Sequence, residues 1–282
     1  MKVILTIAEI REVTKEERKK RKTIGFVPTM GYFHEGHLEL MRQARKTCDV
    51  VIVSIFVNPI QFGLAEDYAR YPRNLERDKS LVTEVKVDYL FLPSTEEMYP
   101  EELLVYANVE KLSEPLCGKF RPGHFRGVAT VVAKLFNIVQ PDAAFFGEKD
   151  YQQLLVVKKM VKDLNFDVKI VPIPTVREVD GLAMSSRNVY LSDEERRVAQ
   201  AIPKSLQLAK DLIKAGEKDT KVIRRAMEEL LLREPLINLE YLSISDATSL
   251  EELGKIEKEA LIALALRVGK TRLIDNIAVR CD

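Results

Sequence analysis

The fold is decided by Ile24-Gly25-Phe26-Val27, Pro28-Thr29-Met30-Gly31 and His34-Glu35-Gly36-His37, which follow one another near the start of the chain. The first four residues are apolar and predict a short buried strand. The next four predict a turn, and Leu38 to Lys46 predict a helix. A strand, a glycine-bearing loop and a helix start together present free backbone N–H groups to a phosphate. Two imidazoles in the same place add donors, so the stretch predicts a nucleotide site that handles phosphoryl charge.

Three other interpretations of the two histidines remain open at this point. One is a zinc site, although the metalloprotease pattern places histidines four apart on one helix face, and these are three apart with Gly36 between them. Both could also be ordinary loop residues. The third is a dinucleotide-binding loop, but this stretch lacks the Gly-x-Gly-x-x-Gly pattern.

Length and composition describe a globular protein with little overall charge. The chain has 282 residues, 46% of them hydrophobic, and 44 Lys and Arg stand against 43 Asp and Glu. A balance of this kind exerts no general attraction on nucleic acid or on an anionic membrane. The longest apolar run, Ala260 to Leu266, is far shorter than the roughly 18 residues of a membrane helix. Three scattered cysteines and no signal-peptide pattern predict a cytoplasmic protein without a disulfide framework.

The first two thirds of the chain alternate apolar strands with amphipathic helices, which predicts a doubly wound α/β domain with a parallel sheet, Rossmann-like in its layout. The expected strands are 24–27, 50–57, 89–92, 143–146 and 168–173, and the expected helices are 37–46, 75–85, 128–139 and 152–164. Ligands of such sheets bind beyond the carboxyl ends of the strands. The histidine pair follows the first expected strand, which is where a site is expected.

After about Val189 the pattern changes. Ser192 and Glu195 form a capping box that predicts a helix to about Ala215, and a second helix is expected from Thr220 to Arg233. The ranges 239–244, 260–267 and 272–278 then predict strands, with a hairpin connection at 267–272. We therefore expect a catalytic domain at 1–189 and a smaller C-terminal α+β domain at 190–282.

Two amides follow the second expected strand. Asn58 and Gln61 both donate and accept hydrogen bonds, which suits a substrate with hydroxyls or a carbonyl. For Asn58 a turn fixed by Pro59 is an equally open interpretation. Arg121 and His124, which lead into another expected helix, could gather anionic groups, contact a subunit or be solvated, and the sequence leaves their role open.

Two later segments carry chemistry suited to polyphosphate. Lys149 lies at a strand-to-helix junction, where its ammonium makes a movable charge for phosphate. Gln153 is expected about one turn into the helix, facing the same crevice. Ser185-Ser186-Arg187 offers two hydroxyls and a guanidinium, which can clamp phosphate oxygens.

These motifs together resemble one family. The His34-Glu35-Gly36-His37 loop with Met184-Ser185-Ser186-Arg187 resembles the nucleotidylyltransferase superfamily. The chain is further identified as a member of the pantothenate synthetase (pantoate–β-alanine ligase) family by Asn58-Pro59-x-Gln61-Phe62, Tyr71-Pro72-Arg73, Arg121-Pro122-Gly123-His124-Phe125 and Phe146-Gly147-Glu148-Lys149-Asp150-x-Gln152-Gln153. Tyr32-Phe33 replace the smaller Ala-Leu pair usual in the family, and Asn74 replaces Thr.

The resemblance implies an ATP-dependent ligation of pantoate and β-alanine through a pantoyl adenylate, which releases pyrophosphate and AMP. It implies catalytic roles for His34, His37, Lys149 and Arg187. ATP would be bound by these four residues together with Met30, Gly31, Gly147, Asp150, Val176, Met184, Ser185 and Ser186. Pantoate and β-alanine would be bound by Gln61, Gln153, Asn58 and Met30.

The resemblance also implies Mg²⁺ bound with the ATP phosphates, no metal ligands supplied by the protein, and a homodimer. Two other functions stay open. The chain could transfer AMP onto a phosphate ester of a cofactor precursor, or it could bind nucleotides without turnover.

Overall fold

The computed structural model describes residues 1–63 and 66–281. The chain forms two compact units. Unit 1 comprises Met1–Ser113, Arg121–Glu148 and Gln152–Thr175, and unit 2 comprises Glu114–Phe120, Lys149–Tyr151 and Val176–Asp282. These units divide at Val176, whereas the functional division at 189/190 remains a prediction.

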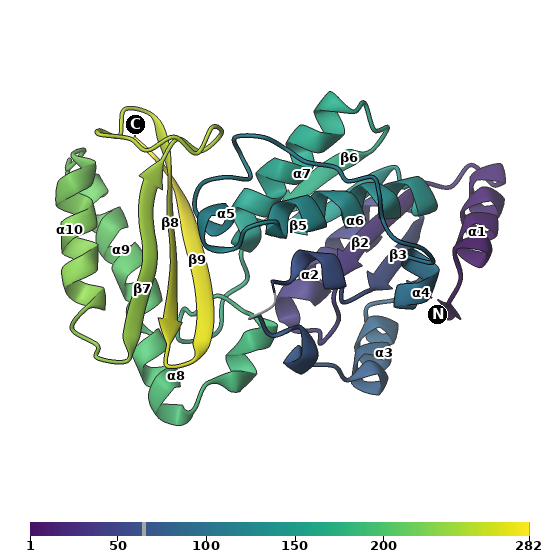
Figure 1. Ribbon diagram of the computed structural model, residues 1–282, viewed down its shortest axis with the longest axis horizontal. Helices are drawn as coiled ribbons and strands as arrows, with labels where there is room; N and C mark the ends of the chain where they lie inside the picture. Colours follow the sequence, from purple (N-terminus) through teal and green to yellow (C-terminus); the bar gives the residue numbers. More distant parts are fainter. Residues whose placement is uncertain (64–65, 282) are drawn as a thin grey trace. The chain divides into compact units, whose positions relative to one another are not determined.

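Unit 1 is built on a parallel sheet of six strands in the order β1-β4-β3-β2-β5-β6 (Figure 1). The strands are β1 (Lys2–Ile4), β2 (Ile24–Thr29), β3 (Val50–Ile55), β4 (Tyr89–Phe91), β5 (Ala143–Gly147) and β6 (Lys169–Ile173). Strand β3, Val-Val-Ile-Val-Ser-Ile, has its first five residues buried, as expected of a strand covered on both faces. The α/β prediction is confirmed, with all five predicted strands of this part present.

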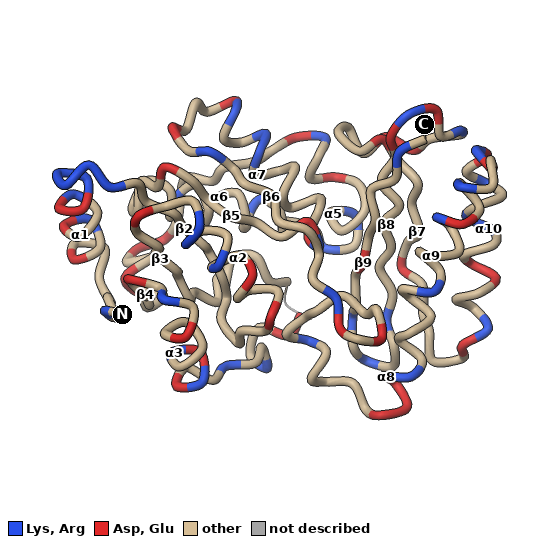
Figure 2. Tube along the Cα trace, turned by 180° about the vertical axis from the view of Figure 1, so that it is seen from behind, with Lys and Arg blue, Asp and Glu red and all other residues tan. Residues whose placement is uncertain are grey.

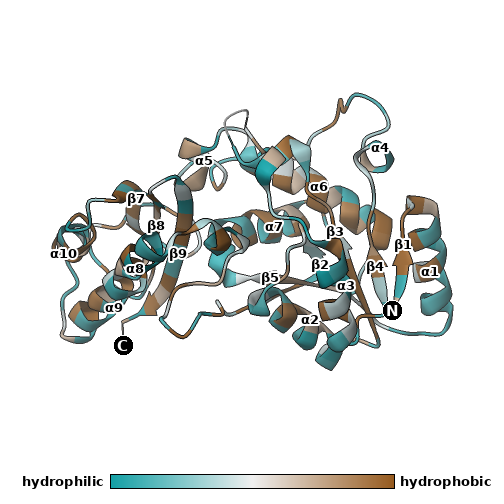
Figure 3. Cartoon of the chain, turned by 90° about the horizontal axis from the view of Figure 1, so that it is seen from below, coloured by the Kyte–Doolittle hydropathy of each residue, from teal (hydrophilic) through white to brown (hydrophobic). Residues whose placement is uncertain are grey.

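Helices alternate with these strands along the chain. They are α1 (Ile7–Lys19), α2 (Glu35–Thr47), α3 (Leu75–Glu84), α4 (Thr95–Met98), α6 (His124–Val139) and α7 (Tyr151–Asp163), whose first residue belongs to unit 2. Figure 3 shows α1 with hydrophilic and hydrophobic residues interspersed along its length. Helix α6 is the most buried, with Phe125, Val128, Leu135 and Phe136 in the core. The short 3-10 turns η1 (Pro59–Gln61) and η2 (Tyr68–Arg70) lie between β3 and α3. Another, η3 (Glu148–Asp150), follows β5, and its last two residues belong to unit 2.

The direction of winding reverses at β2. From β2 the chain moves outward through β3 and β4, and it then returns to place β5 on the other side of β2, followed by β6. In open α/β sheets such a switch point is where ligands bind. The loop after β2, which carries His34 and His37, therefore starts at the switch point.

Unit 2 contains an antiparallel sheet in the order β7-β8-β9, formed by Ile237–Ser245, Glu259–Val268 and Thr271–Arg280. Val268 pairs with Thr271, which confirms the predicted hairpin. Helices α8 (Asp193–Ala199), α9 (Ala201–Lys214) and α10 (Thr220–Leu231) belong to this unit, and so does the short helix α5 (Cys117–Phe120). Helices α9 and α10 contact β9 and β7 (Figure 1). The predicted C-terminal α+β fold is confirmed.

Several elements differ from the prediction. The single helix expected from Ser192 to Ala215 is interrupted at Gln200, which ends α8 and precedes α9. Pro203 explains the break, because it has no N–H to donate to the carbonyl of Ala199. Strand β1, with three residues, and helix α1 were not predicted, although Thr6 and Glu9 form a capping box that marks the start of α1.

Surface charges of both signs are interspersed on the outer helices, as Figure 2 shows for α1 and α3. None of the described helices combines the length and the apolar character needed to cross a bilayer.

Glu17 on α1 offers a test of how this unit is held together. Its buried carboxylate pairs with Lys20 at 2.9 Å and Lys22 at 2.7 Å and accepts a hydrogen bond from the Tyr89 hydroxyl of β4. Hydrogen bonds from Lys22 and Lys20, which outweigh burial, lower the pKa of Glu17 to about 2. A carboxyl whose pKa is depressed by folding stabilises the protein above its unfolded pKa, and this contribution disappears as pH falls through the folded value.

We expect Glu17→Gln to lower the free energy of unfolding by about 1–2 kcal/mol at pH 7. This is less than the full pKa shift would give, because both lysines are half-exposed and solvent screens the ion pairs. The difference from wild type should shrink between pH 4.5 and 2 in urea titrations. Glu12→Gln is the matched control, because Glu12 on the same helix is exposed and its lysine lies at 3.9 Å. A difference that stays constant down to pH 2 would contradict the ion-pair account.

Candidate active site

His34 and His37 form the start of helix α2 with their own side chains. His34 is the N-cap, and its Nδ1 accepts the N–H of Gly36 at 3.1 Å. His37, one turn further, accepts the backbone N–H of His34 on its Nδ1 at 3.3 Å. The two rings lie 4.0 Å apart between centroids. The predicted helix start at His37 is therefore two residues late, because His34 caps a helix that begins at Glu35.

These hydrogen bonds fix the tautomer of both imidazoles. A ring nitrogen that accepts an N–H must carry a lone pair, so the proton of each neutral ring resides on Nε2. The one N–H of each neutral ring is then on Nε2, the nitrogen that does not contact the backbone in these two hydrogen bonds. Two imidazolium ions at this separation would also repel each other. The loop is thus a pair of neutral donors at the start of a helix, where the helix dipole favours an anion.

The turn before the histidines needs unusual backbone angles. Gly31 has φ +82° and Tyr32 has φ +51°, both in the left-handed region. A Cβ on Gly31 would lie 2.8 Å from Ile55 Cγ2, so only glycine fits there.

A buried carboxylate from α3 holds this turn. Asp78, 2% exposed, accepts the backbone N–H of Tyr32 at 2.7 Å and of Phe33 at 2.8 Å. Burial raises the pKa of Asp78, while these two bonds act in the opposite direction. Arg77 donates to the Phe33 carbonyl and lies over the Tyr32 ring. Tyr32, at which the chain departs from the family pattern, therefore packs against the helix that Asn74 caps.

The two amides after β3 belong to one chain of hydrogen bonds. The Tyr99 hydroxyl donates to Asn58 Oδ1 at 2.8 Å, Asn58 Nδ2 donates to Gln61 Oε1 at 3.0 Å, and Gln61 Nε2 donates to Met30 Sδ at 3.2 Å. Asn58 is 1% exposed and also donates to the Gly127 carbonyl. The oxygen and the nitrogen of the Asn58 amide therefore both bond to protein groups, and its hydrogen bond orients the Gln61 side chain.

Helix α6 packs against η1, the turn that carries Gln61. A Cβ on Gly127 would lie 2.4 Å from the Ile60 carbonyl oxygen and 2.6 Å from Gln61 Cα, so glycine permits the contact between α6 and η1. His124 Nδ1 lies 2.9 Å from the Gln61 carbonyl oxygen. Arg121 is paired with Glu66 through Nε and Oε1 at 2.8 Å. Burial opposes ionisation of Glu66, but Arg121 outweighs it and lowers the pKa. Arg121 and His124 thus contact the segments around Glu66 and Gln61.

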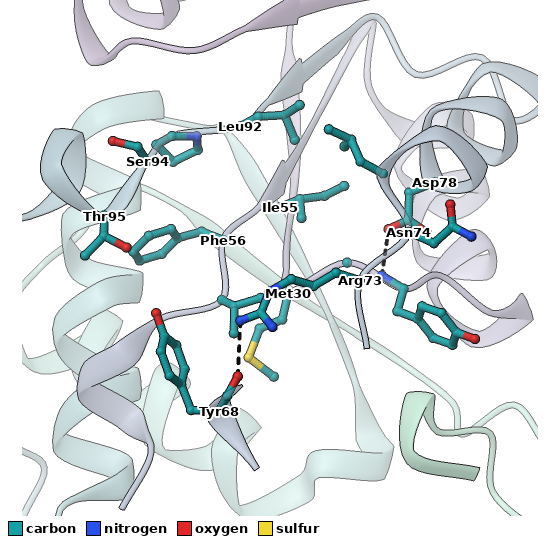
Figure 4. Close-up of a pocket in the computed structure, with 15 residues that line it drawn as sticks. Met30, Ile55, Phe56, Tyr68, Arg73, Asn74, Asp78, Leu92, Ser94 and Thr95 are labelled. Atoms are coloured by element: carbon teal, nitrogen blue, oxygen red, sulfur yellow. Dashed lines mark hydrogen bonds between the residues drawn. The ribbon is translucent and has the colours of Figure 1, made fainter. Parts of the chain in front are cut away.

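A cavity of about 310 Å³ lies beyond the carboxyl ends of β2, β3 and β4 (Figure 4). Two of the predicted site residues, Met30 and Gly31, line it. The cavity is also lined by the apolar residues Phe56 and Leu92 and by the charged residues Arg73 and Asp78. Met30 therefore touches both this cavity and the Gln61 amide.

Gln61 and Gln153 follow strands on opposite sides of β2. Gln61 follows β3 and Gln153 lies near the start of α7, after β5, and these strands flank β2 on its two sides. Gln153 is half-buried, and Gly147 is the last residue of β5.

The remaining predicted residues belong to unit 2. Lys149 Nζ lies 3.9 Å from Asp150 Oδ2. The Met184 N–H donates to the Val176 carbonyl at 3.0 Å, which closes the base of a hairpin. Ser185 caps the 3-10 turn η4 (Ser186–Tyr190) by accepting the Arg187 N–H, and Ser186 is buried. Arg187 is thus the second residue of a turn that directly follows the hairpin.

The parallel sheet places the histidine loop at its switch point, the position at which open α/β sheets bind ligands. Comparison with known proteins identifies the family. The family model for pantoate-beta-alanine ligase matches residues 2–278. Pantothenate synthetase of Caldicellulosiruptor bescii is 58% identical over 279 residues, covering 99% of each chain, and that of Moorella thermoacetica is 57% identical over the full length of both.

Solved structures agree. Pantothenate synthetase from Thermus thermophilus superposes with a TM-score of 0.94 at 49% identity, covering 98% of this chain and 99% of the other. Pantoate-beta-alanine ligase from Francisella tularensis, complexed with β,γ-ATP and β-alanine, gives 0.81 at 35% identity, covering 98% and 97%.

The chain belongs to the pantoate–β-alanine ligase family. It is an enzyme, and its reaction is the ATP-dependent ligation of pantoate and β-alanine. These relatives do not favour AMP transfer onto a phosphate ester or nucleotide binding without turnover.

We expect Gly127→Ala to weaken pantoate binding at least tenfold, because the new methyl group would push the η1 backbone and move Gln61. ATP affinity should change less than twofold. Gly254→Ala is the matched control, since a Cβ there meets no atom within 4 Å. Calorimetric titration of both variants gives the answer, and normal pantoate affinity in Gly127→Ala would show that η1 can shift without disturbing the amide.

Proposed function

We propose that the ligation proceeds in two steps through a pantoyl adenylate. In the first, the pantoate carboxylate attacks the α-phosphorus of ATP and pyrophosphate leaves. In the second, the amine of β-alanine attacks the acyl carbon, the bond between that carbon and the oxygen bridging to phosphorus breaks, and AMP leaves. In both steps the main task of the protein is to hold the reactants in line. This orientation supplies much of the rate acceleration.

The observation that carries this proposal is the position of His34 and His37 at the start of α2, directly after the central strand β2. A carboxylate that approaches a polyphosphate brings two anions together, so the site must supply donors or positive charge where negative charge develops. Neutral imidazoles can donate to the phosphoryl oxygens without protonating the attacking carboxylate. We assign both histidines to stabilisation of the α-phosphoryl group during the first step.

We assign the binding of the ATP phosphates to residues of unit 2. Lys149 and Arg187 supply two positive charges, and the hydroxyls of Ser185 and Ser186 can donate to phosphate oxygens. The remaining ATP contacts are proposed at backbone positions near these groups and near the histidines: Met30, Gly31, Gly147, Asp150, Val176 and Met184.

Pantoate recognition is assigned to Gln61 and Gln153, with Met30 as an apolar contact. Pantoate carries two hydroxyls and a carboxylate, and neutral amides can bind the hydroxyls without competing with the carboxylate for phosphorus. Asn58 belongs to this site through Gln61, because its own amide is bonded to Tyr99, Gln61 and Gly127.

Mg²⁺ is proposed to enter with the ATP phosphates. This ion keeps several waters and typically takes only one or two protein carboxylates in addition to phosphate oxygens. The described residues contain no group of three or more His, Cys, Asp or Glu side chains that could hold a metal ion. When bound, it would neutralise phosphate charge.

A cytoplasmic homodimer is part of the same proposal and rests on the family resemblance. Sedimentation equilibrium at micromolar concentration should give twice the 32.2 kDa chain mass, and a monomer mass would refute the dimer.

The adenylate mechanism predicts exchange of labelled pyrophosphate into ATP that requires pantoate but not β-alanine. His37→Ala should slow this exchange roughly 10²-fold, since one lost donor to a developing anion costs about 3 kcal/mol. Formation of ADP, or exchange that needs β-alanine, would refute a free-standing first step.

Gln61→Leu and Gln153→Leu should each raise the dissociation constant of pantoate at least tenfold. Leucine keeps a similar volume but leaves the pantoate hydroxyl without its partner, at about 1–3 kcal/mol. ATP affinity should barely change. Gln43→Leu, on the outer part of α2 where the amide donates to Glu39, is the control. Equal losses for both ligands would mean that the site had collapsed, and no loss for pantoate would place its pocket elsewhere.

A further inference from the structure

Strand β9 carries two buried polar residues in an apolar setting. Asp275 and Asn276 are 2% and 7% exposed, and they stand between the apolar pairs Leu273-Ile274 and Ile277-Ala278. Buried polar groups cost free energy unless they are hydrogen-bonded. The hydrogen-bond partners of Asp275 and Asn276 therefore indicate what these two residues do in β9.

Asn276 holds the backbone of Lys149. Its Nδ2 donates to the Lys149 carbonyl oxygen at 2.7 Å, although the two residues are 127 positions apart in the chain. Lys149 lies in the short turn η3, and its side chain is 19% exposed. A lysine side chain is long and flexible, so its ammonium can be placed reproducibly only if the backbone that carries it is fixed.

Asp275 holds the hairpin before the serine-arginine loop. Its carboxylate accepts two bonds from Arg177, at 2.7 and 3.0 Å, in the bidentate geometry that gives the strongest such pairs. Arg177 also donates to the carbonyl oxygens of Gly181 and Asn276. Since Arg177 pairs with Ala183 across the hairpin, Asp275 anchors both of its arms.

The hairpin leads directly into the residues assigned to phosphate. Met184 bonds back to Val176, and Ser185 begins η4, which contacts β9. Two neighbouring side chains of one strand therefore hold the two segments, around Lys149 and around Arg187, that are separated by more than thirty residues in sequence.

We propose that Asp275 and Asn276 are positioning residues for the phosphate-binding groups: Asn276 sets the place of Lys149, and Asp275, through Arg177, sets the place of Ser185-Ser186-Arg187. This inference rests on the proposed function of Lys149 and Arg187. It makes the C-terminal sheet part of the catalytic apparatus, although β9 supplies no group that touches the substrate in this scheme.

A purely structural role must be distinguished from positioning, because breaking a buried ion pair can also destabilise the fold. A double-mutant cycle does this. If Asn276 acts only by placing Lys149, its substitution has little further effect once the ammonium is gone, whereas independent damage adds.

The test compares Asn276→Ala, Lys149→Ala and the double variant in pantoate-dependent pyrophosphate exchange. Asn276→Ala should lower the exchange kcat/KM for ATP at least tenfold and leave the pantoate dissociation constant within twofold. In the Lys149→Ala background the same change should cost less than threefold. Asn276→Asp, which keeps the shape but removes the donor, should reproduce the loss.

Arg177→Lys tests the hairpin half in the same way against Arg187→Ala. Lysine keeps the charge but cannot make the bidentate pair, so we expect at least a fivefold loss that disappears in the Arg187→Ala background. Glu240→Gln is the control on the same sheet, since Glu240 of β7 pairs with Arg267 of β8 and Arg272 of β9. It should leave ATP kinetics unchanged.

The outcomes separate the proposed function from the positioning inference. Normal exchange in Lys149→Ala would refute the proposed role of Lys149 itself. A defective Lys149→Ala with normal Asn276 variants, or losses that simply add in the double variant, would refute the positioning inference alone. Thermal unfolding of each variant shows whether an additive loss comes from instability.

Discussion

The parallel pairing of β2 with β3 on one side and β5 on the other is the constraint on which unit 1 depends. It brings the segments that follow three strands to the same edge of the sheet: the histidine loop after β2, the amides after β3 and Gly147 at the end of β5. Parallel strands leave no short connection, so each return to the sheet needs a helix, and each helix start offers N–H groups at this edge. The position of the histidines follows from the winding order.

Much of this could be predicted because the signals are local. The apolar residues of β2 and β3 lie together in the sequence, and the Ser192–Glu195 capping box marks the start of α8. The helix break at Gln200 was missed although Pro203 is visible in the sequence, because the apolar pattern continues across it.

The contacts that hold the candidate site could not be predicted, since they join residues far apart in the chain. In sequence, Asp78 is an acidic residue near the start of a helix, where the helix dipole alone explains it. In the structure it holds the turn 45 residues earlier. Gly127 likewise has no distinctive pattern around it, yet it permits the contact with η1. The chemical groups could be identified from the sequence, whereas their supports required the fold.

The acceptor role of both Nδ1 atoms has a consequence for the proton balance of the reaction. Because each imidazole already bears its proton on Nε2 and uses its other nitrogen for the backbone, the loop has no vacant base with which to take a proton from a substrate. Pantoate arrives ionised and needs no base. The ammonium of β-alanine must lose one proton before it attacks and a second proton as the amide forms. Since Nδ1 of each histidine already accepts a backbone N–H, neither proton can go to that nitrogen while these two hydrogen bonds persist.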